Sequence, residues 1–372
     1  MGIETRHVYL SKELVNKGHQ VQLFISDSNH QLSAKPNVYK ETKDGVDIEW
    51  LKTVKYQKAY GIKRIFSWLH FEFVLRKRLR KLTDKPDVAI VSSLSLLSII
   101  NGIWLKKKYG CKLVFEVRDI WPLVLIRISS LSTNNLMYKV LEKVEQRGYA
   151  SSDLIVGTMP NLKEHVHKTQ PNKKVLWIPH LINPSVKLDS QHSYTDDLEK
   201  LRIDSNTKFI AYAGSINKSS SIELLMKVAD QMKDDNLKFL LLGDGPLLAE
   251  LKEKYSGGNI HFFDKIKQSE VVAFLSDCDI LYDGYLSSDI YKFGNSRNKY
   301  VDYCLAKKPI VVSYEGYSFF VSKYECGLIV KPESEEDLIR AFRLLVQKDE
   351  KELERLGQNA FKFASENLSI EK

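Results

Sequence analysis

Lys208-Phe-Ile-Ala-Tyr-Ala213 runs directly into Gly214-Ser-Ile-Asn-Lys-Ser-Ser-Ser221, and this junction decides the fold class. The first segment is an apolar run of the length of a buried strand, whereas the second is small and polar and predicts a turn. A helical pattern begins near Ile222. A strand, a turn and a helix in this order make up half of a βαβ unit, so the stretch predicts a parallel sheet.

The same alternation of short apolar runs and longer helical patterns extends along the chain and predicts two sets of strands. The first set lies at residues 20–26, 87–92, 112–117, 153–157 and 174–178, with 47–51 as a weaker candidate. The second set lies at residues 208–213, 238–243, 259–263, 279–282, 309–313 and 327–330. The predicted fold class is therefore α/β, with two doubly wound Rossmann-like domains that face each other across a cleft.

Residues 183–200 separate the two sets and predict a linker, because they hold Pro184, several charges and no hydrophobic periodicity. The expected domains are residues 1–182 and 201–372. Residues 4–17 predict an amphipathic helix, although a doubly wound domain normally begins with a strand. We therefore expect that a first strand with its glycine-rich loop, and a closing helix, lie outside this sequence. The alternative is a domain that begins with a helix.

Composition and charge narrow the class of protein. With 372 residues, of which 43% are hydrophobic and 28% charged, the chain has the profile of a soluble globular protein. A net charge of +9 favours an anionic partner, which can be a nucleotide sugar, a nucleic acid or an anionic lipid surface. The chain has no CxxC spacing, no apolar run of spanning length and no signal-peptide pattern, so we expect reduced, buried cysteines and a cytoplasmic location.

The turn after residue 213 is the first candidate phosphate site. Gly214 and Ser215 leave the backbone open to close approach, and Lys218 would add a full positive charge beside a diphosphate. Ser220 and Glu223 have the spacing of a capping box, which would satisfy free N–H groups at the helix start. The alternative is an ordinary βα turn with a solvated lysine, and the loop matches neither GxGxxG nor a Walker sequence.

A second glycine turn, Gly243-Asp244-Gly245-Pro246, closes the strand at residues 238–243. Its glycines permit a tight turn and close approach of a ligand to the backbone. Alone it indicates little, because Gly-Asp-Gly-Pro is favourable turn chemistry whether or not anything binds.

The third candidate is the loop Gly294-Asn295-Ser296-Arg297-Asn298-Lys299, which leads into a helix that holds Asp302. Cations in the first turn of a helix cost about 0.3–1 kcal/mol each unless an anion arrives, so Arg297 and Lys299 predict an absent phosphate. Asp302 would then accept hydrogen bonds from ribose hydroxyls. The alternatives for Asp302 are an i, i+4 partner of Asn298 or Ala306, or a plain surface acid.

Two acidic motifs receive opposite interpretations. Arg118 and Asp119 follow the strand at residues 112–117, at the edge where α/β enzymes collect their chemistry. Arg118 would meet an anion, and Asp119 would orient a sugar hydroxyl or accept a proton; a structural Arg–Asp pair is the equally weighted alternative. Asp277-Cys278-Asp279 is a DxD pattern of the kind that holds a divalent metal in some enzymes, but it lies in a predicted helix-to-strand connection, so we expect no metal site.

Residues 62–82 predict a basic helix with apolar residues along its length. Trp68 and the neighbouring phenylalanines and leucines would enter a membrane interface, where cations meet anionic headgroups. The basic candidates for this contact are Arg76, Lys77, Arg78, Arg80 and Lys81. The alternative is a core-packing helix with a solvated basic end. Nucleic acid is a third interpretation, which we do not favour because no recognised binding module surrounds the segment.

These motifs resemble family 4 glycosyltransferases of the two-domain GT-B fold, and among them the bacterial O-antigen fucosamine-transferase type. The segments that carry the resemblance extend over nearly the whole chain and are Ile3-Glu-Thr-Arg-His7 with Gly18-His19, Arg118-Asp-Ile-Trp-Pro122, Gly157-Thr-Met-Pro-Asn-Leu-Lys163, Trp177-Ile-Pro179, Tyr212-Ala-Gly214, Gly243-Asp-Gly-Pro246 and Gly294–Tyr303. Together these segments are specific for the family, whereas no single segment is.

The resemblance implies a retaining transfer of a sugar, expected to be an N-acetylated aminosugar, from a nucleotide-diphosphate donor such as UDP, without a metal or other cofactor. The acceptor would be a lipid-linked saccharide at the inner face of the cell membrane during polysaccharide synthesis. By resemblance, Lys218 and the loop Asn295–Lys299 stabilise the leaving diphosphate. Asp302 matches the second acid of the family's spaced glutamate pair, which contacts the ribose.

Other functions stay open at this point. A nucleotide-sugar 2-epimerase shares the GT-B fold, and a non-catalytic nucleotide-sugar-binding protein would carry the same donor motifs. A dinucleotide dehydrogenase ranks lower, because neither domain carries the full glycine fingerprint.

The sequence departs from the family pattern at several positions. Gly294 stands where the first acid of the pair would fall, Arg297 replaces the usual proline, and His180-Leu181 stand in place of Asn-Gly. Arg297 would alter the contacts with the phosphates, and His180-Leu181 would change the contacts near the linker.

Overall fold

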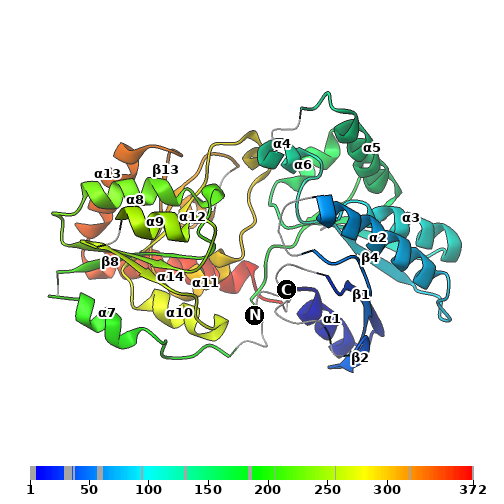
Figure 1. Cartoon of the computed structure of the whole chain (residues 1–372), viewed down its shortest axis with the longest axis horizontal. Coiled ribbons are helices and arrows are strands. Elements are labelled where there is room, and N and C mark those ends of the chain that lie inside the picture. Colours follow the sequence, from blue (N-terminus) through cyan, green and yellow to red (C-terminus); the bar gives the residue numbers. More distant parts are fainter. Residues whose placement is uncertain are drawn as a thin grey trace. The chain divides into compact units, whose positions relative to one another are not determined.

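The computed structural model describes residues 6–28, 36, 38–56, 62–93, 95–129, 132–182, 187–204, 206–255, 257–317 and 320–370. The chain forms two compact units, Met1–Pro179 and His180–Lys372 (Figure 1). Each unit is a layered α/β structure. Pro184, on which the linker prediction relied, lies outside the described residues, as do Ile3 to Thr5 of the first resemblance motif.

The described part of the first unit holds two sheets and the helices around them. Its elements are α1 (Arg6–Asn16), β1 (Val21–Ser26), β2 (Lys40–Lys43), β3 (Val46–Leu51), α2 (Ile62–Leu79), β4 (Val88–Ser92), α3 (Ser98–Tyr109), β5 (Lys112–Val117), α4 (Leu123–Ser129), α5 (Leu136–Ser151), β6 (Leu154–Gly157), α6 (Leu162–His167) and β7 (Val175–Trp177). One sheet has the order β1-β3-β2, with β2 antiparallel to β3, and the other is parallel in the order β4-β5-β6-β7. Helix α3 packs against β4 and β5, and α1 packs against β1 and β3.

The described residues of the second unit form one six-stranded sheet with helices around it. Its elements are α7 (Thr195–Leu201), β8 (Lys208–Ala213), the 3₁₀ turn η1 (Lys218–Ser220), α8 (Ile222–Gln231), β9 (Leu237–Leu242), α9 (Leu248–Tyr255), β10 (Ile260–Phe263), α10 (Gln268–Ser276), β11 (Ile280–Gly284), η2 (Asp289–Phe293), α11 (Lys299–Leu305), β12 (Ile310–Ser313), α12 (Phe320–Lys323), β13 (Gly327–Val330), α13 (Glu335–Val346) and α14 (Glu350–Asn367). The strand order is β10-β9-β8-β11-β12-β13, and every pairing is parallel.

Helices cover both faces of this sheet because β8 is apolar on both sides. Phe209, Ala211 and Ala213 belong to the core beneath α10, α11 and α14. Ile210 and Tyr212, which alternate with them, belong to the core beneath α8, α9 and α13. The two helical layers lie on opposite sides of the sheet in Figure 1. Strands that are buried on both faces are expected in a doubly wound parallel sheet, so the predicted α/β fold is confirmed.

The predicted strands are confirmed, with ends that differ by no more than one residue except at β11, which continues to Gly284. Strand β2 was not predicted. Its four residues are all exposed and give no apolar alternation, and its pairing with β3 is what forms it. A strand without a buried face carries no period-2 signal in the sequence.

Helix α7 overlaps the end of the predicted linker. Asp196 and Asp197 lie in its first turn, where the helix dipole favours negative charge, and Leu198 is buried in the core. The second unit therefore begins its ordered packing before residue 201.

The four cysteines are buried free thiols. In the part of the chain that the structure describes, no helix is both long enough and apolar enough to cross a membrane.

Candidate functional site

The strand order of the second unit reverses between β8 and β11. From β8 the chain adds β9 and β10 on one side of the sheet, and from β11 it adds β12 and β13 on the other. In doubly wound sheets, ligands bind outside the carboxyl ends of the strands at such a switch point. The residues at this point are Gly214 after β8 and Asp283 and Gly284 at the end of β11.

The two predicted glycine turns lie against each other beside this point. Gly214 and Gly243 have φ angles of 143° and 148°, and a Cβ added to Gly243 would lie 2.0 Å from Gly214 O. Ile216 N donates to Asp244 O at 3.0 Å. Only glycine permits this approach of the two backbones. The turns therefore form one surface, on which the side chains of Ser215, Lys218 and Asp244 are exposed.

The predicted capping box at the start of α8 is wrong. Residues Lys218–Ser220 form the turn η1, and Ser221, with φ of 49°, precedes the helix without a side-chain cap bond. Ser220 Oγ instead donates to Ser215 O at 3.3 Å. The hydroxyl therefore braces the turn and does not cap the helix.

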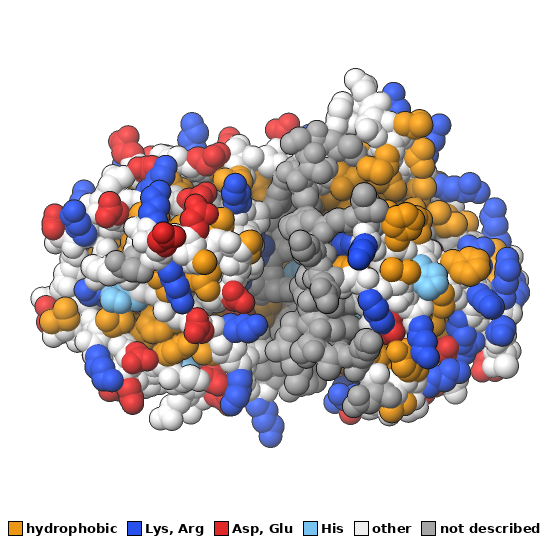
Figure 2. All heavy atoms as spheres, in the orientation of Figure 1, with side chains coloured by type: hydrophobic (Ala, Val, Ile, Leu, Met, Phe, Trp, Pro, Cys, Tyr) orange, Lys and Arg blue, Asp and Glu red, His pale blue; other side chains and the backbone are white. Residues whose placement is uncertain are grey.

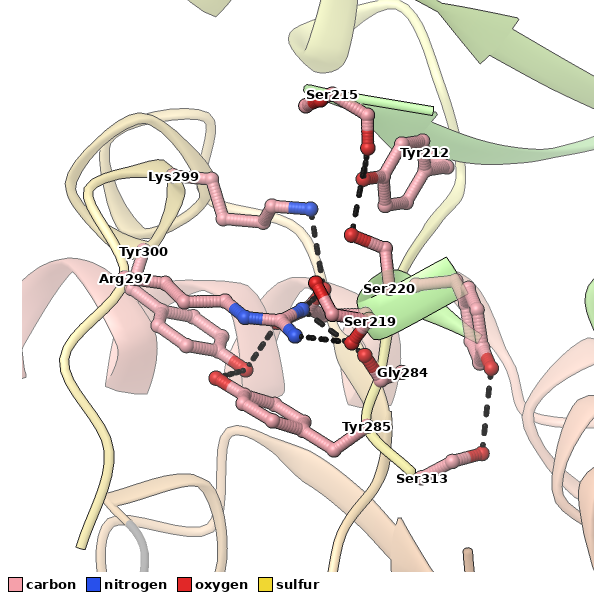
Figure 3. Close-up of polar contacts among 12 residues, drawn as sticks. Tyr212, Ser215, Ser219, Ser220, Gly284, Tyr285, Arg297, Lys299, Tyr300 and Ser313 are labelled. Atoms are coloured by element: carbon pink, nitrogen blue, oxygen red, sulfur yellow. Dashed lines mark hydrogen bonds and ion pairs between the residues drawn. The ribbon is translucent and has the colours of Figure 1, made fainter. Parts of the chain in front are cut away.

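Asp283 is the centre of a polar cluster that the sequence motifs did not reveal. Its side chain is fully buried, and Oδ1 is 2.5 Å from Arg297 Nη1 and 3.0 Å from Lys299 Nζ. Tyr300 Oη donates to Oδ2 at 2.6 Å. Arg297 also donates to Gly284 O at 2.9 Å and to Ser219 O at 2.7 Å, so its guanidinium joins the end of β11 to the turn after β8 (Figure 3).

Aromatic rings cover both cations of the cluster. The guanidinium carbon of Arg297 lies 3.6 Å from the centroid of the Tyr285 ring, and Lys299 Nζ lies 3.7 Å from that of Tyr212. Tyr212 Oη donates to Ser215 O at 2.7 Å. The two cations therefore lie between the turn after β8 and the loop before α11, where cation–π attraction adds to the ion pairs.

The structure supplies the anion that the cations were predicted to lack. Helix α11 begins at Lys299, so Arg297 precedes the helix and does not lie in its first turn. Both cations face the Asp283 carboxylate. A carboxylate of the same chain therefore balances one of the two charges, and the binding of a phosphate by the remaining charge stays a prediction.

The ionisation of Asp283 follows from its neighbours. Burial alone would raise the pKa of this carboxyl, but the charges of Arg297 and Lys299 and the hydrogen bond from Tyr300 outweigh burial and hold the pKa below its usual value. The carboxylate is ionised at neutral pH. Two cations and one anion leave the cluster with one formal positive charge, next to the surface formed by the two glycine turns.

Asp302 lies one turn after Lys299, on the side of α11 that meets α10. Both carboxylate oxygens are 3.1 Å from Gln268 Nε2, so the partner is a residue of α10 and neither of the i, i+4 neighbours considered from the sequence. Burial raises the pKa of Asp302 to about 7, although the Gln268 hydrogen bond opposes the rise. The contact of Asp302 with a ribose stays a prediction.

The other loop residues before α11 differ in exposure. Asn295 and Ser296 are partly buried, whereas Asn298, the residue that precedes the helix, is exposed. Their contacts with a donor, like those of Ser215, Lys218, Asp244 and Gly245, stay predictions.

In the first unit, Arg118 and Asp119 lie at the carboxyl end of β5, as predicted. Ser93, after β4, accepts from Arg118 N at 2.9 Å and donates to Asp119 O at 3.4 Å. Thr158, after β6, donates to Arg118 O at 3.3 Å. The segment is therefore held through its backbone between the neighbouring strand ends, with the Asp119 side chain exposed. The catalytic roles of the two side chains stay predictions.

The sequence reasoning missed Glu116, which lies just before this segment. Arg6 Nε is 3.0 Å from one oxygen of Glu116, and His7 Nε2 is 2.6 Å from the other. Burial would raise the pKa of Glu116, but His7 and Arg6 hold it well below its usual range. Part of the signal was present, because Arg6 and His7 belong to a segment that carries the family resemblance and Glu116 lies two residues before another. Their pairing across more than a hundred residues could not be deduced from either segment.

Helix α2 has a stripe of exposed apolar side chains. Some of the cations on and just after the helix bind other residues of the unit, and others are exposed. Ile65, Phe66, Leu69 and Phe73 are between 48% and 68% exposed. Trp68 packs edge-on against Trp121, with ring centroids 5.8 Å apart. Figure 2 shows hydrophobic and basic side chains side by side on the surface of the first unit.

Two of the predicted membrane-contact cations are engaged within the unit. Arg76 bonds to Asn101 and to Ile100 O, and Arg78 pairs with Glu49 at 2.7 Å. Lys77, Arg80 and Lys81 are exposed. Of the five predicted cations, the structure therefore leaves these three exposed.

The DxD acids have protein partners. Asp277 pairs with His192 at 3.0 Å, and Asp279 pairs with Arg202 and Lys208 at 3.4 and 3.3 Å. Among the described residues, no three of His, Cys, Asp or Glu are grouped as a metal would require. The motif forms the connection between α10 and β11, as predicted.

Two protein-family models match the chain. The model described as Glycosyltransferase Family 4 matches residues 1–186, which is half of the 372 residues. The chain belongs to glycosyltransferase family 4. The model described as Glycosyl transferases group 1 matches residues 193–363 of the enzyme, which include the whole switch point.

Two curated relatives of this family 4 enzyme carry the same general name. An uncharacterized glycosyltransferase of Methanocaldococcus jannaschii is 23% identical over 282 residues, which cover 74% of this chain and 69% of that protein. The probable glycosyltransferase WbjE of Pseudomonas aeruginosa is 20% identical over 248 residues, which cover 63% of this chain and 60% of that protein.

Solved structures share the fold of the enzyme. Sucrose-phosphate synthase from Thermosynechococcus elongatus matches with a TM-score of 0.76 at 16% identity, over 100% of this chain and 90% of that one. HepE from Anabaena, solved in complex with UDP-glucose, matches with a TM-score of 0.62 at 13% identity, over 94% and 96% of the two chains. These likenesses agree with the GT-B fold predicted from the sequence.

Proposed function

We propose that this family 4 glycosyltransferase transfers a sugar from a UDP-sugar to a lipid-linked saccharide, with retention of configuration at the anomeric carbon. An N-acetylated aminosugar as the transferred group, and bacterial O-antigen or capsule synthesis as the pathway, are part of the proposal. The observation that carries it is the positively charged cluster of Arg297, Lys299 and Asp283 at the switch point. HepE, which has the same fold, was solved with UDP-glucose, and this supports a UDP-sugar donor.

In this proposal the second unit binds the donor nucleotide. The diphosphate lies over the turns at Gly214–Ser215 and Gly243–Gly245, with Lys218 and Lys299 as its cationic contacts. Arg297 adds positive charge next to Lys299. Asn295, Ser296 and Asn298 are further contacts with the donor. Asp302 accepts hydrogen bonds from the ribose hydroxyls. The exposure of Lys218 and the partial exposure of Lys299 leave both ammonium groups within reach of a ligand.

The chemical task of these residues is to stabilise the departing diphosphate. As the bond between the anomeric carbon and the diphosphate oxygen breaks, negative charge grows on the leaving group. Fixed cations in a partly buried site stabilise that charge more than water does. The acceptor oxygen attacks the same face of the sugar, and its proton moves to the diphosphate, so the protein needs no covalent nucleophile.

The first unit binds the acceptor in this proposal. Asp119 orients the acceptor hydroxyl, and Arg118 meets an anionic group of the lipid-linked substrate. The apolar stripe of α2, with Lys77, Arg80 and Lys81 beside it, docks on the anionic inner face of the cell membrane, as amphipathic basic helices do. Nucleic acid and metal have no part in the proposal.

The test is a turnover assay in chelator with a panel of UDP-sugars and membranes that carry lipid-linked saccharides. We expect UDP release that depends on the membranes, and transfer of one sugar with the anomeric configuration of the donor. Conversion of a UDP-sugar without an acceptor would instead favour the 2-epimerase, and donor binding without turnover would favour a non-catalytic binding protein. Loss of activity in chelator would contradict the metal-independent part of the proposal.

A further inference from the structure

The cations of the Asp283 cluster are held in different ways. Arg297 donates to the Asp283 carboxylate and to two backbone carbonyls, those of Gly284 and Ser219. Among the residues that the structure describes, Lys299 has one ionic partner, Asp283 Oδ1 at 3.0 Å, and its ammonium lies over the ring of Tyr212. Arg297 therefore binds two elements at once, whereas a movement of the Lys299 side chain alone would exchange this ionic contact for another.

The ammonium group of Lys299 lies where a diphosphate over the turn would meet it. A Cβ built on Gly214 would be 3.1 Å from Lys299 Nζ, so the ammonium lies directly against the first residue of the turn. The Lys299 side chain is 13% exposed and Asp283 is fully buried. The Lys299 ammonium therefore lies between the buried Asp283 carboxylate and the accessible turn at Gly214.

We propose that Asp283 is a resident anion that competes with the diphosphate of the donor, and of the UDP product, for Lys299. In the absence of ligand, Lys299 binds Asp283. When a diphosphate arrives, Lys299 turns to it, while Arg297 stays on Asp283 and keeps the turn after β8 attached to β11. The return of Lys299 to Asp283 then favours release of the product. This inference rests on the proposed donor site and assigns Asp283 a role in setting its affinity.

The experiment is a double-mutant cycle on the full chain, with inorganic pyrophosphate and UDP as the probes in calorimetric titrations. Asp283→Asn keeps the size of the side chain but removes the competing charge. We expect it to tighten binding of both probes about tenfold, which corresponds to removal of about 1.4 kcal/mol of competition. Lys299→Gln should weaken binding. In the Lys299→Gln background, Asp283→Asn should no longer tighten it, because the exchanged partner is gone.

The cycle separates partner exchange from simple repulsion. If Asp283 only repelled the diphosphate, Asp283→Asn would tighten binding with or without Lys299, and that result overturns the proposal. Unchanged or weaker binding by Asp283→Asn overturns it too. Asp234→Asn, an exposed acid of the same unit, is the control for net charge and should leave binding unchanged.

A second variant keeps the test valid if Asp283→Asn does not fold with Arg297 unpaired. The combination of Asp283→Asn with Arg297→Gln removes the buried pair and retains one formal positive charge on the cluster, as in the wild type. Replacing both members of the pair by uncharged residues leaves no unpaired buried charge, which is the main cause of destabilisation when one partner is removed. This variant should bind pyrophosphate more tightly than Arg297→Gln alone, in which Asp283 still holds Lys299, and equal or weaker binding overturns the proposal. Wild-type protein that binds neither probe would overturn the donor site itself, which distinguishes that failure from a failure of the exchange.

Discussion

At the scale of single residues, Asp283 and Arg297 are each the ionic partner that allows the other to be buried. Arg297 stands where the family resemblance leads to the expectation of proline, and its guanidinium donates to the carboxylate of Asp283, 14 residues earlier in the chain. An arginine buried at that position without a carboxylate would be strongly destabilising. The motif around Arg297 was visible in the sequence, but its partner was not, because β11 and the loop before α11 meet only in the folded unit.

Asp302 gives a prediction about nucleotide binding. If its carboxylate accepts hydrogen bonds from the ribose, Asp302→Ala should weaken UDP binding about tenfold, since a hydrogen bond to a charged group contributes about 1.5–3 kcal/mol. Calorimetric titration with UDP measures this effect. The matched control is Asp234→Ala on the exposed surface of the same unit. Equal affinity of wild type and Asp302→Ala would remove Asp302 from the donor site.

Asp302 also gives a prediction about pH. Burial raises its pKa from 3.8 to about 7, so between these values the folded protein holds a proton that the unfolded chain has released. The free energy of unfolding should therefore fall as the pH rises from about 4 to about 7, and should then level off. Asp302→Asn should lack this contribution and be more stable than the wild type at pH 8. Urea denaturation of both proteins at pH 5 and pH 8 checks the sign, and parallel pH profiles would contradict it.

At the scale of elements, the glycine turns after β8 and β9 define the surface of the candidate site. Gly243→Ala should destabilise the protein by about 2–5 kcal/mol, because a positive φ and a backbone clash with Gly214 O act together. Gly257→Ala is the matched control. Gly257 also has a positive φ, of 102°, but an added Cβ there would meet open space. Denaturant unfolding of the two variants should show the larger loss for Gly243→Ala, and similar losses would contradict the close packing of the turns.

Helix α2 gives a prediction about membranes. Replacement of Lys77, Arg80 and Lys81 by glutamate should reduce binding to vesicles that contain anionic lipid, because each cation near such a surface contributes about 1 kcal/mol. Arg76 and Arg78 are left intact, since their contacts with Asn101 and Glu49 hold the helix in the unit. Phe73→Ser tests the apolar part separately, as Phe73 is 68% exposed. Unchanged sedimentation with vesicles for both variants would contradict membrane docking by this helix.

The helices and strands also show which features of the structure could be predicted from the sequence. Apolar runs such as those of β8 and β9 predicted the strands of the second unit, because buried parallel strands are apolar on both faces. The start of α8 was predicted wrongly, since a 3₁₀ turn precedes it and its hydroxyl braces the turn. The polar clusters around Asp283 and Glu116 could not be predicted, because their partners come from distant strands and loops. A side chain's partner is a tertiary property, whereas periodicity reports only which face is buried.

At the scale of the whole molecule, family membership, the α/β fold and the charged switch point of the second unit all support the proposed nucleotide-diphosphate site. The chain belongs to glycosyltransferase family 4, and the turns at Gly214 and Gly243 lie at the edge of the sheet where doubly wound folds bind ligands. The net charge of +9 fits an anionic donor and an anionic membrane.

The most direct test of this account is a calorimetric titration of the full chain with UDP in the presence of chelator, repeated with Lys299→Gln and with Lys233→Gln. Lys233 is an exposed lysine between α8 and the start of β9, at the amino ends of the strands, whereas Lys299 follows the carboxyl end of β11. We predict that the wild type and Lys233→Gln bind UDP equally and that Lys299→Gln binds it at least tenfold more weakly. Equal binding by all three proteins, or no binding by the wild type, would contradict a donor site at the switch point between β8 and β11.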